Sequence, residues 1–143
     1  MQSKTTYEYL QSHRYMILAA HTVYDPADAT PYYFGLLGGS PPSGADIYAI
    51  PVSLKGTIRT VVIRLDIGTI GTNETASLYI RKNGTTDYLI TTISYDTKPQ
   101  TITVQNLAIP LDVGDYYSFK LVCPTWATNP LQVREVVSVY HES

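Results

Sequence analysis

The sequence contains little charge for its size. Only 15% of its 143 residues are Asp, Glu, Lys or Arg, against about 25% in an ordinary soluble domain. The formal net charge is −2 and the basic residues form no run, which argues against nucleic acid as a partner. A chain with so few charges either builds an unusually apolar core or covers part of its surface with other subunits.

Cysteine and histidine are also scarce. The single cysteine, Cys123, excludes an internal disulfide framework. Strand alternation places its side chain inward, which favours a small core residue over a reactive or intermolecular thiol. The three histidines, His13, His21 and His141, form no pair with zinc-binding spacing, and His21 is interpreted as a satisfied buried side chain.

Signatures of catalysis are missing as well. No Gly-x-Ser-x-Gly segment occurs, and the acids fall mostly in turns, where Asp accepts hydrogen bonds from backbone N–H groups. Asp25 and Asp28 share one loop but lack the further oxygen ligands of a calcium site. The sequence therefore predicts a protein that is not an enzyme and uses no metal or cofactor.

Long apolar segments are absent too. No run reaches the roughly 18 apolar residues that a membrane span needs, so we expect no membrane insertion. Residues 1–15 lack the continuous apolar region of a secretory signal, which predicts a protein made in a cytoplasm.

What the sequence does contain is a succession of short alternating runs. Ala76–Lys82 and Asp87–Tyr95 flank the dipeptide Asn83-Gly84, which type I′ hairpin turns favour because both of their central residues need φ > 0. The run Tyr116–Cys123 places alternate side chains on one face. These inward residues are Tyr117, Phe119, Leu121 and Cys123.

Further runs lie on either side of this segment: Tyr15–Tyr24, Tyr32–Leu37, Ile47–Leu54, Thr57–Ile67, Thr101–Ile109 and Leu131–Tyr140. In Thr57–Ile67, the hydrophobic row faces inward and Arg64 and Asp66 fall on the outward row. The last run carries Glu135 within an otherwise apolar row.

About eight such strands with no sustained helical periodicity predict an all-β fold, an antiparallel two-sheet sandwich of the jelly-roll kind. We expect the sandwich to occupy residues 15–143. An N-terminal arm, residues 1–14, precedes it. The arm is either a mobile terminus or an attachment segment that orders on a partner.

The run Tyr15–Tyr24 is apolar on both faces, which is more than one sandwich interior requires. An exposed second face would form a hydrophobic patch, and identical chains arranged around an axis bury such patches by symmetry. The sequence therefore predicts a cyclic homo-oligomer.

The segment Leu78–Leu121 resembles a known family. It reads LYIRKNG, a hairpin return, and then ITVQNLAIPLDVGDYYSFKL, in which Leu111-Asp-Val-Gly-Asp115 leads directly into the next strand. This pattern is similar to the trimeric jelly rolls of complement and tumour-necrosis-factor type heads. It is similar in particular to the small versions found as fibre tips and head fibres of tailed bacteriophages.

The resemblance implies a homotrimer whose C-terminal strand lies near the three-fold axis, and a role in adhesion or decoration instead of chemistry. The predicted trimer-interface residues come from the first and last strands of the sandwich. They are Tyr15, Ile17, Ala19, Val137 and Val139.

We therefore expect a non-enzymatic virion structural protein, a fibre, spike or decoration module on a phage particle. It would be made in the host cytoplasm and bind other virion proteins through its N-terminal arm. The alternatives are a capsid cement protein without receptor binding and a carbohydrate-binding, lectin-like module of cellular origin.

Aromatic residues in or beside loops are the candidates for surface recognition, with a host surface glycan as the prospective partner. Aromatic rings stack on the apolar faces of sugars and anchor protein interfaces. The candidates are Trp126, Tyr32, Tyr33 and Tyr48. For Trp126, the alternative is a cap over the open end of the sandwich.

Overall fold

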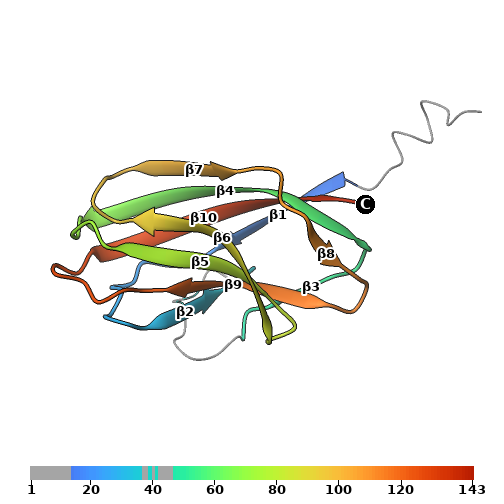
Figure 1. Cartoon of the computed structure of the whole chain (residues 1–143), viewed down its shortest axis with the longest axis horizontal. Helices are drawn as coiled ribbons and strands as arrows, with labels where there is room; N and C mark the ends of the chain where they lie inside the picture. The colour runs from blue at the N-terminus through green and yellow to red at the C-terminus, as the bar shows by residue number, and fades with distance from the viewer. Residues whose placement is uncertain (1–13, 37–38, 40, 42–46) are drawn as a thin grey trace, which may run out of the picture.

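The computed structural model describes residues 14–36, 39, 41 and 47–143. In this part of the chain all regular structure is β: ten strands, all paired antiparallel, form two stacked sheets (Figure 1). The prediction of an antiparallel two-sheet jelly-roll sandwich is confirmed, with two short strands beyond the eight expected. Of the predicted arm, residues 1–13 lie outside the described residues, and Arg14 is the first residue of β1.

The first sheet, sheet A, has the strand order β1-β10-β4-β7, and β8 also pairs with β4. Its strands are β1 (Arg14–Ala20), β4 (Gly56–Thr69), β7 (Gln100–Val104), β8 (Ile109–Leu111) and β10 (Leu131–Glu142). β10 lies between β1 and β4 along most of its length, which makes it central to the sheet (Figure 1).

The second sheet, sheet B, has the order β2-β9-β5-β6, and β3 also pairs with β9. Its strands are β2 (Pro31–Phe34), β3 (Ile50–Pro51), β5 (Thr75–Lys82), β6 (Thr86–Ser94) and β9 (Tyr116–Val122). The pairings of the two sheets are nested, from β1 with β10 at the outside to β5 with β6 at the centre. This nesting is the strand order of a jelly roll.

Strand alternation builds the core. The inward row of β4 packs between the two sheets. All four members of this row are buried: Val61, Ile63, Leu65 and Ile67. On β9 the buried row consists of Tyr117, Phe119 and Leu121, and it continues to Cys123 just beyond the strand. Both inward rows agree with the sequence prediction.

The Asn83-Gly84 turn adopts the geometry that its sequence predicts. Both residues have positive φ, 54° and 68°, which a type I′ hairpin requires. The Asn83 side chain also reaches a second turn: its amide donates to Asp115 Oδ1 at 3.0 Å, and its oxygen accepts from the backbone N–H of Tyr116 at 3.0 Å. Side-chain hydrogen bonds of Asn83 therefore connect this turn to the turn that ends at Asp115.

The predicted strand Thr101–Ile109 is two strands in the structure. β7 ends at Val104 and β8 begins at Ile109, and both pair with β4. Asn106, between them, has a φ of 61°, a left-handed conformation that interrupts an extended chain.

The predicted interface residues Ala19, Val137 and Val139 are fully buried in the single chain. The prediction for these three is wrong, because their row of β1 and β10 faces the core and offers nothing to another subunit. Tyr15 and Ile17 belong to the same inward row and are half-buried. The Tyr15 ring stacks on His141, with ring centroids 4.4 Å apart.

The opposite row supplies the second apolar face that the sequence predicts for the first strand. Met16 is 62% exposed, Leu18 is 55% exposed and, on β10, Val136 is 47% exposed. We call these three residues the β1–β10 patch. The patch lies on the outer face of sheet A, away from sheet B.

Candidate functional site

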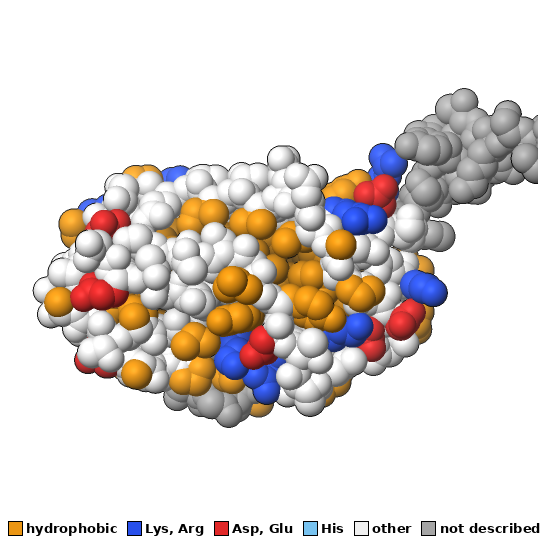
Figure 2. Space-filling model, viewed as in Figure 1, with side chains coloured by type: hydrophobic (Ala, Val, Ile, Leu, Met, Phe, Trp, Pro, Cys, Tyr) orange, Lys and Arg blue, Asp and Glu red, His pale blue; other side chains and the backbone are white. Residues whose placement is uncertain are grey.

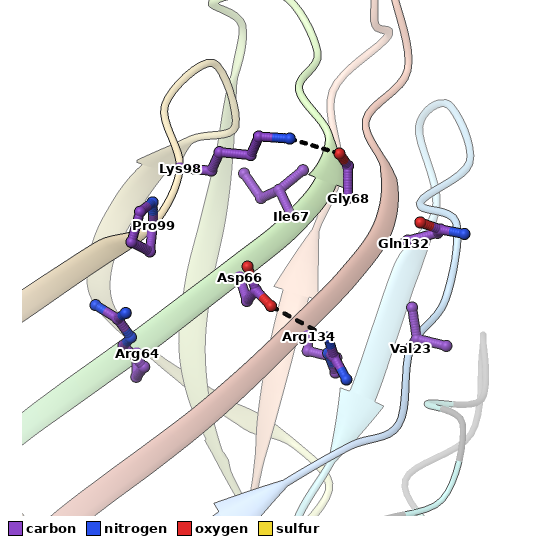
Figure 3. Close-up of a pocket in the computed structure, with 9 residues that line it drawn as sticks. All are labelled: Val23, Arg64, Asp66, Ile67, Gly68, Lys98, Pro99, Gln132 and Arg134. Atoms are coloured by element: carbon purple, nitrogen blue, oxygen red, sulfur yellow. Dashed lines mark hydrogen bonds and ion pairs between the residues drawn. The ribbon is translucent and has the colours of Figure 1, made fainter.

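A groove of about 750 Å³ opens on the outer face of sheet A, where β4 ends and β10 begins (Figure 3). Nine residues line it: Val23, Arg64, Asp66, Ile67, Gly68, Lys98, Pro99, Gln132 and Arg134. We call it the basic groove. Its size lies within the range of about 300–1,000 Å³ that is typical of small-molecule sites.

The sheet positions the charged side chains of the groove. The alternation that buries Leu65 directs Arg64 and Asp66 outward from β4. Arg134 of β10 is the cross-strand partner of Asp66, so the two side chains lie side by side. Lys98, from the loop between β6 and β7, completes the group (Figure 3).

Hydrogen bonds and one ion pair hold these groups in place. Arg134 Nη2 lies 3.1 Å from Asp66 Oδ2, in a pair whose side chains are both more than half exposed. Lys98 Nζ donates to the Gly68 carbonyl at 2.7 Å (Figure 3). Arg64 Nη1 donates to Thr101 Oγ1 at 3.1 Å, which uses one of the five N–H donors of the guanidinium.

The groove is positive on a molecule that is negative overall. Its lining contains three cationic side chains and one carboxylate, a local charge of +2, whereas the whole chain carries a formal charge of −2. Apolar walls complete the groove: Figure 3 shows Pro99 beyond one side of β4 and Val23 beyond β10. Such a site attracts an anion that also has an apolar surface.

Trp126, a predicted recognition residue, lies in the core. It is only 5% exposed, and its ring packs edge-on against Tyr95 with centroids 5.5 Å apart. Its backbone N–H donates to Asp28 Oδ1 at 3.0 Å, which fixes the loop around it. This placement fits the cap over the end of the sandwich and leaves no free ring face for a sugar.

None of the three predicted recognition tyrosines is fully exposed. Tyr33 is buried beneath Arg81, whose guanidinium carbon lies 5.7 Å from the ring centroid. Tyr32 is half-buried, and its hydroxyl accepts a hydrogen bond from the Ala27 backbone N–H at 3.0 Å. Tyr48 is half-buried, with its backbone carbonyl packed against Gly35.

The face of the molecule in Figure 2 carries its charges as small separate groups among hydrophobic and neutral side chains. In sheet B, Asp87 lies 2.8 Å from Lys120 and 3.4 Å from Arg81. Because Asp87 is shared by two cations, this group has less unpaired positive charge than the basic groove.

A second polar cluster lies inside the sandwich. His21 Nε2 is 2.8 Å from Glu135 Oε2, and the Tyr95 hydroxyl donates to Glu135 Oε1 at 2.7 Å. All three side chains are buried, so no substrate in solvent reaches them. The burial of His21 agrees with the sequence interpretation. Its partner is Glu135, and the sequence signal for it is a charged residue within an otherwise apolar row.

Across residues 14–36, 39, 41 and 47–143, no three His, Cys, Asp or Glu side chains are placed to hold a metal ion. Nor does this part of the chain contain a helix that is long and apolar enough to cross a membrane.

Comparison with protein families found no family model that matches the chain, and comparison with curated proteins found no match. The resemblance of Leu78–Leu121 to phage fibre heads therefore stays a prediction. Function has to be inferred from the two surface features of sheet A, the β1–β10 patch and the basic groove.

Proposed function

We propose that this chain is a non-enzymatic structural module of a phage particle, a fibre, spike or decoration protein that assembles as a homotrimer. The observation that carries the proposal is the β1–β10 patch on the outer face of sheet A. The phage setting is supported by the resemblance of the segment Leu78–Leu121 to the trimeric heads of phage fibres.

The patch is continuous across two strands. In the register of the sheet, Leu18 lies opposite Ser138 and Ala20 lies opposite Val136, so Leu18 and Val136 are diagonal neighbours on the outward face. Val62 of β4 lies opposite Ser138 and extends the apolar surface to a third strand. Isolated exposed apolar residues are ordinary, but a contiguous group favours a contact with another protein surface.

The position of the patch favours another copy of the same chain. β1 lies at the edge of sheet A, and an edge strand with apolar outward side chains promotes association. Copies related by a closed rotation bury the same patch in every subunit and leave none exposed. With β10 beside β1, this arrangement also brings the C-terminal strand close to the axis, as the resemblance implies.

We assign attachment to the particle to the N-terminal arm, because Arg14, the first residue of β1, lies at one end of sheet A. In a trimer attached through this arm, the long strands of sheet A point away from the particle surface. This arrangement suits a fibre tip or a decoration knob, and it leaves the loops at the far end of sheet A facing outward.

Light scattering from the purified chain tests the proposal. A trimer has a mass of three times the 15.9 kDa of one chain, and particles from which the chain is deleted should lack a projecting density. A stable monomer at micromolar concentration contradicts the assembly, and virions that contain none of the chain contradict the phage setting.

A further inference from the structure

We propose that the basic groove binds an acidic sugar, a saccharide unit that carries one carboxylate. This inference deepens the proposed function and rests on it, because attachment at the β1 end is what presents the groove to the surroundings.

The groove lies at the end of sheet A that is farthest from Arg14, the first residue of β1. Arg14 pairs with Glu142 at one end, and Arg134 in the groove is eight residues back along β10. At about 3.3 Å per residue these positions are about 26 Å apart. Figure 1 shows the start of β1 and the C-terminus together at one end of the sandwich.

The charge of the groove fits a single carboxylate. Among the described residues no carboxylate pairs with Arg64, whereas Arg134 is paired with Asp66 and Lys98 is bonded to a carbonyl. Arg64 therefore keeps donors for a ligand, and the planar guanidinium matches a carboxylate with two parallel hydrogen bonds. Lys98 and Arg134 add positive charge around it.

The other lining groups favour a sugar over an inorganic anion. Asp66 repels a second negative charge, which disfavours phosphate dianions, and its oxygens accept hydrogen bonds from hydroxyl groups. The Gln132 amide both donates to and accepts from hydroxyls. Val23 and Pro99 offer apolar contacts to the C–H face of a sugar ring.

The groove adjoins the β1–β10 patch, since Arg64 of the groove lies opposite Val136 of the patch. In the proposed trimer, three copies of the groove therefore lie beside the subunit contacts and close to one another. An open groove with exposed charges binds one sugar weakly. Three linked sites raise the overall affinity for a repeating acidic polysaccharide by effective concentration.

Nuclear magnetic resonance on the full ¹⁵N-labelled chain tests the site, with glucuronic acid, galacturonic acid and N-acetylneuraminic acid as probes. At least one acidic sugar should shift the backbone amides of Arg64, Lys98 and Gln132 in a saturable way, and glucose should not. Arg64→Gln should weaken this binding about tenfold because it removes the free guanidinium donors. Arg59→Gln is the matched control, since Arg59 is on the same strand but pairs with Glu142 at the opposite end.

Several results overturn the site: no acidic sugar binds the folded chain, inorganic phosphate binds as tightly as every acidic sugar, or both Arg variants weaken binding equally. Binding of an Asp- and Glu-rich peptide without binding of any acidic sugar also overturns it. Light scattering on the same samples separates the two proposals. A monomer that binds the sugar through Arg64 contradicts only the trimer, and a trimer that binds no sugar contradicts only the site.

Discussion

His21 and Glu135 form an ion pair inside the sandwich, with Nε2 and Oε2 2.8 Å apart and neither side chain more than 1% exposed. Both ring nitrogens of His21 face acceptors, because Nδ1 lies 2.8 Å from the Thr22 carbonyl. The second oxygen of Glu135 accepts from the Tyr95 hydroxyl, which follows the last residue of β6 in sheet B. One carboxylate of sheet A thus connects the two layers.

Replacing this carboxylate by an amide should destabilise the fold strongly. Glu135→Gln leaves the shape intact but gives the buried His21 no anion to face, which costs about 3 kcal/mol in the free energy of unfolding. Tyr95→Phe removes a single hydrogen bond and should cost less, about 1–2 kcal/mol. Urea unfolding measures both, and a Glu135→Gln chain as stable as the parent contradicts the role assigned to the pair.

The stability that His21 contributes should depend on pH. Burial lowers the pKa of His21, but the charge and hydrogen bond of Glu135, with the bond to Thr22, outweigh burial and leave the pKa raised. The contribution is complete below the unfolded pKa of about 6.5 and is lost as the pH rises through the raised value. The difference in stability between the parent chain and His21→Gln should therefore shrink as the pH rises above about 6.5.

His141 is the control for this titration, because its dependence has the opposite sign. Burial lowers the pKa of His141, whose Nε2 lies 2.9 Å from the Tyr117 hydroxyl. The unfolded chain therefore binds the proton more tightly, and the stability linked to His141 falls as the pH drops. His141→Gln should remove this loss at low pH, and identical pH profiles for the two variants would contradict both assignments.

The subunit contact should fail when one charge enters the β1–β10 patch. Leu18→Asp places a carboxylate in the centre of the patch, where assembly would bury it unpaired, and the chain should become a folded monomer. Leu89→Asp is the matched control: Leu89 lies on β6 of sheet B and is 56% exposed, against 55% for Leu18. Light scattering with circular dichroism distinguishes loss of assembly from loss of fold, and a trimeric Leu18→Asp chain places the contact elsewhere.

The single thiol should be inert in the folded protein. Burial raises the pKa of the Cys123 thiol to about 12, and the negative charge of Glu135 adds to this effect. The thiolate is the reactive form, so it is scarce near neutral pH. A disulfide reagent should modify Cys123 only after the chain is unfolded in denaturant, and rapid modification of the native protein would favour the reactive-thiol alternative.

Alternation predicted the core rows of β4 and β9 because each of these strands has one apolar and one polar face. β1 has apolar residues on both faces, so the pattern showed that a second face existed without showing which row formed it. In the structure the row of Tyr15, Ile17 and Ala19 faces the core, and the row of Met16 and Leu18 faces outward.

The basic groove was not predicted, because its cations come from separate parts of the chain. Arg64, Lys98 and Arg134 belong to β4, to the loop before β7 and to β10, and each alone resembles an ordinary solvated side chain. The placement of Arg64 and Asp66 on an outward row was correctly predicted. Only the register between β4 and β10, which the sequence does not specify, brings Arg134 beside them.

β1 is joined to β10 at seven positions, and both Arg14 and Glu142 are at the same end of this ladder. If the particle holds the chain at Arg14 and a ligand pulls on it at Arg134, β1 and β10 are pulled in opposite directions along their length. The hydrogen bonds of an antiparallel ladder are perpendicular to this pull, so they are loaded in shear and share the force. Tension between Arg14 and Glu142 would instead peel the two strands apart one pair at a time, which makes the far end of the sandwich the mechanically strong place to grip.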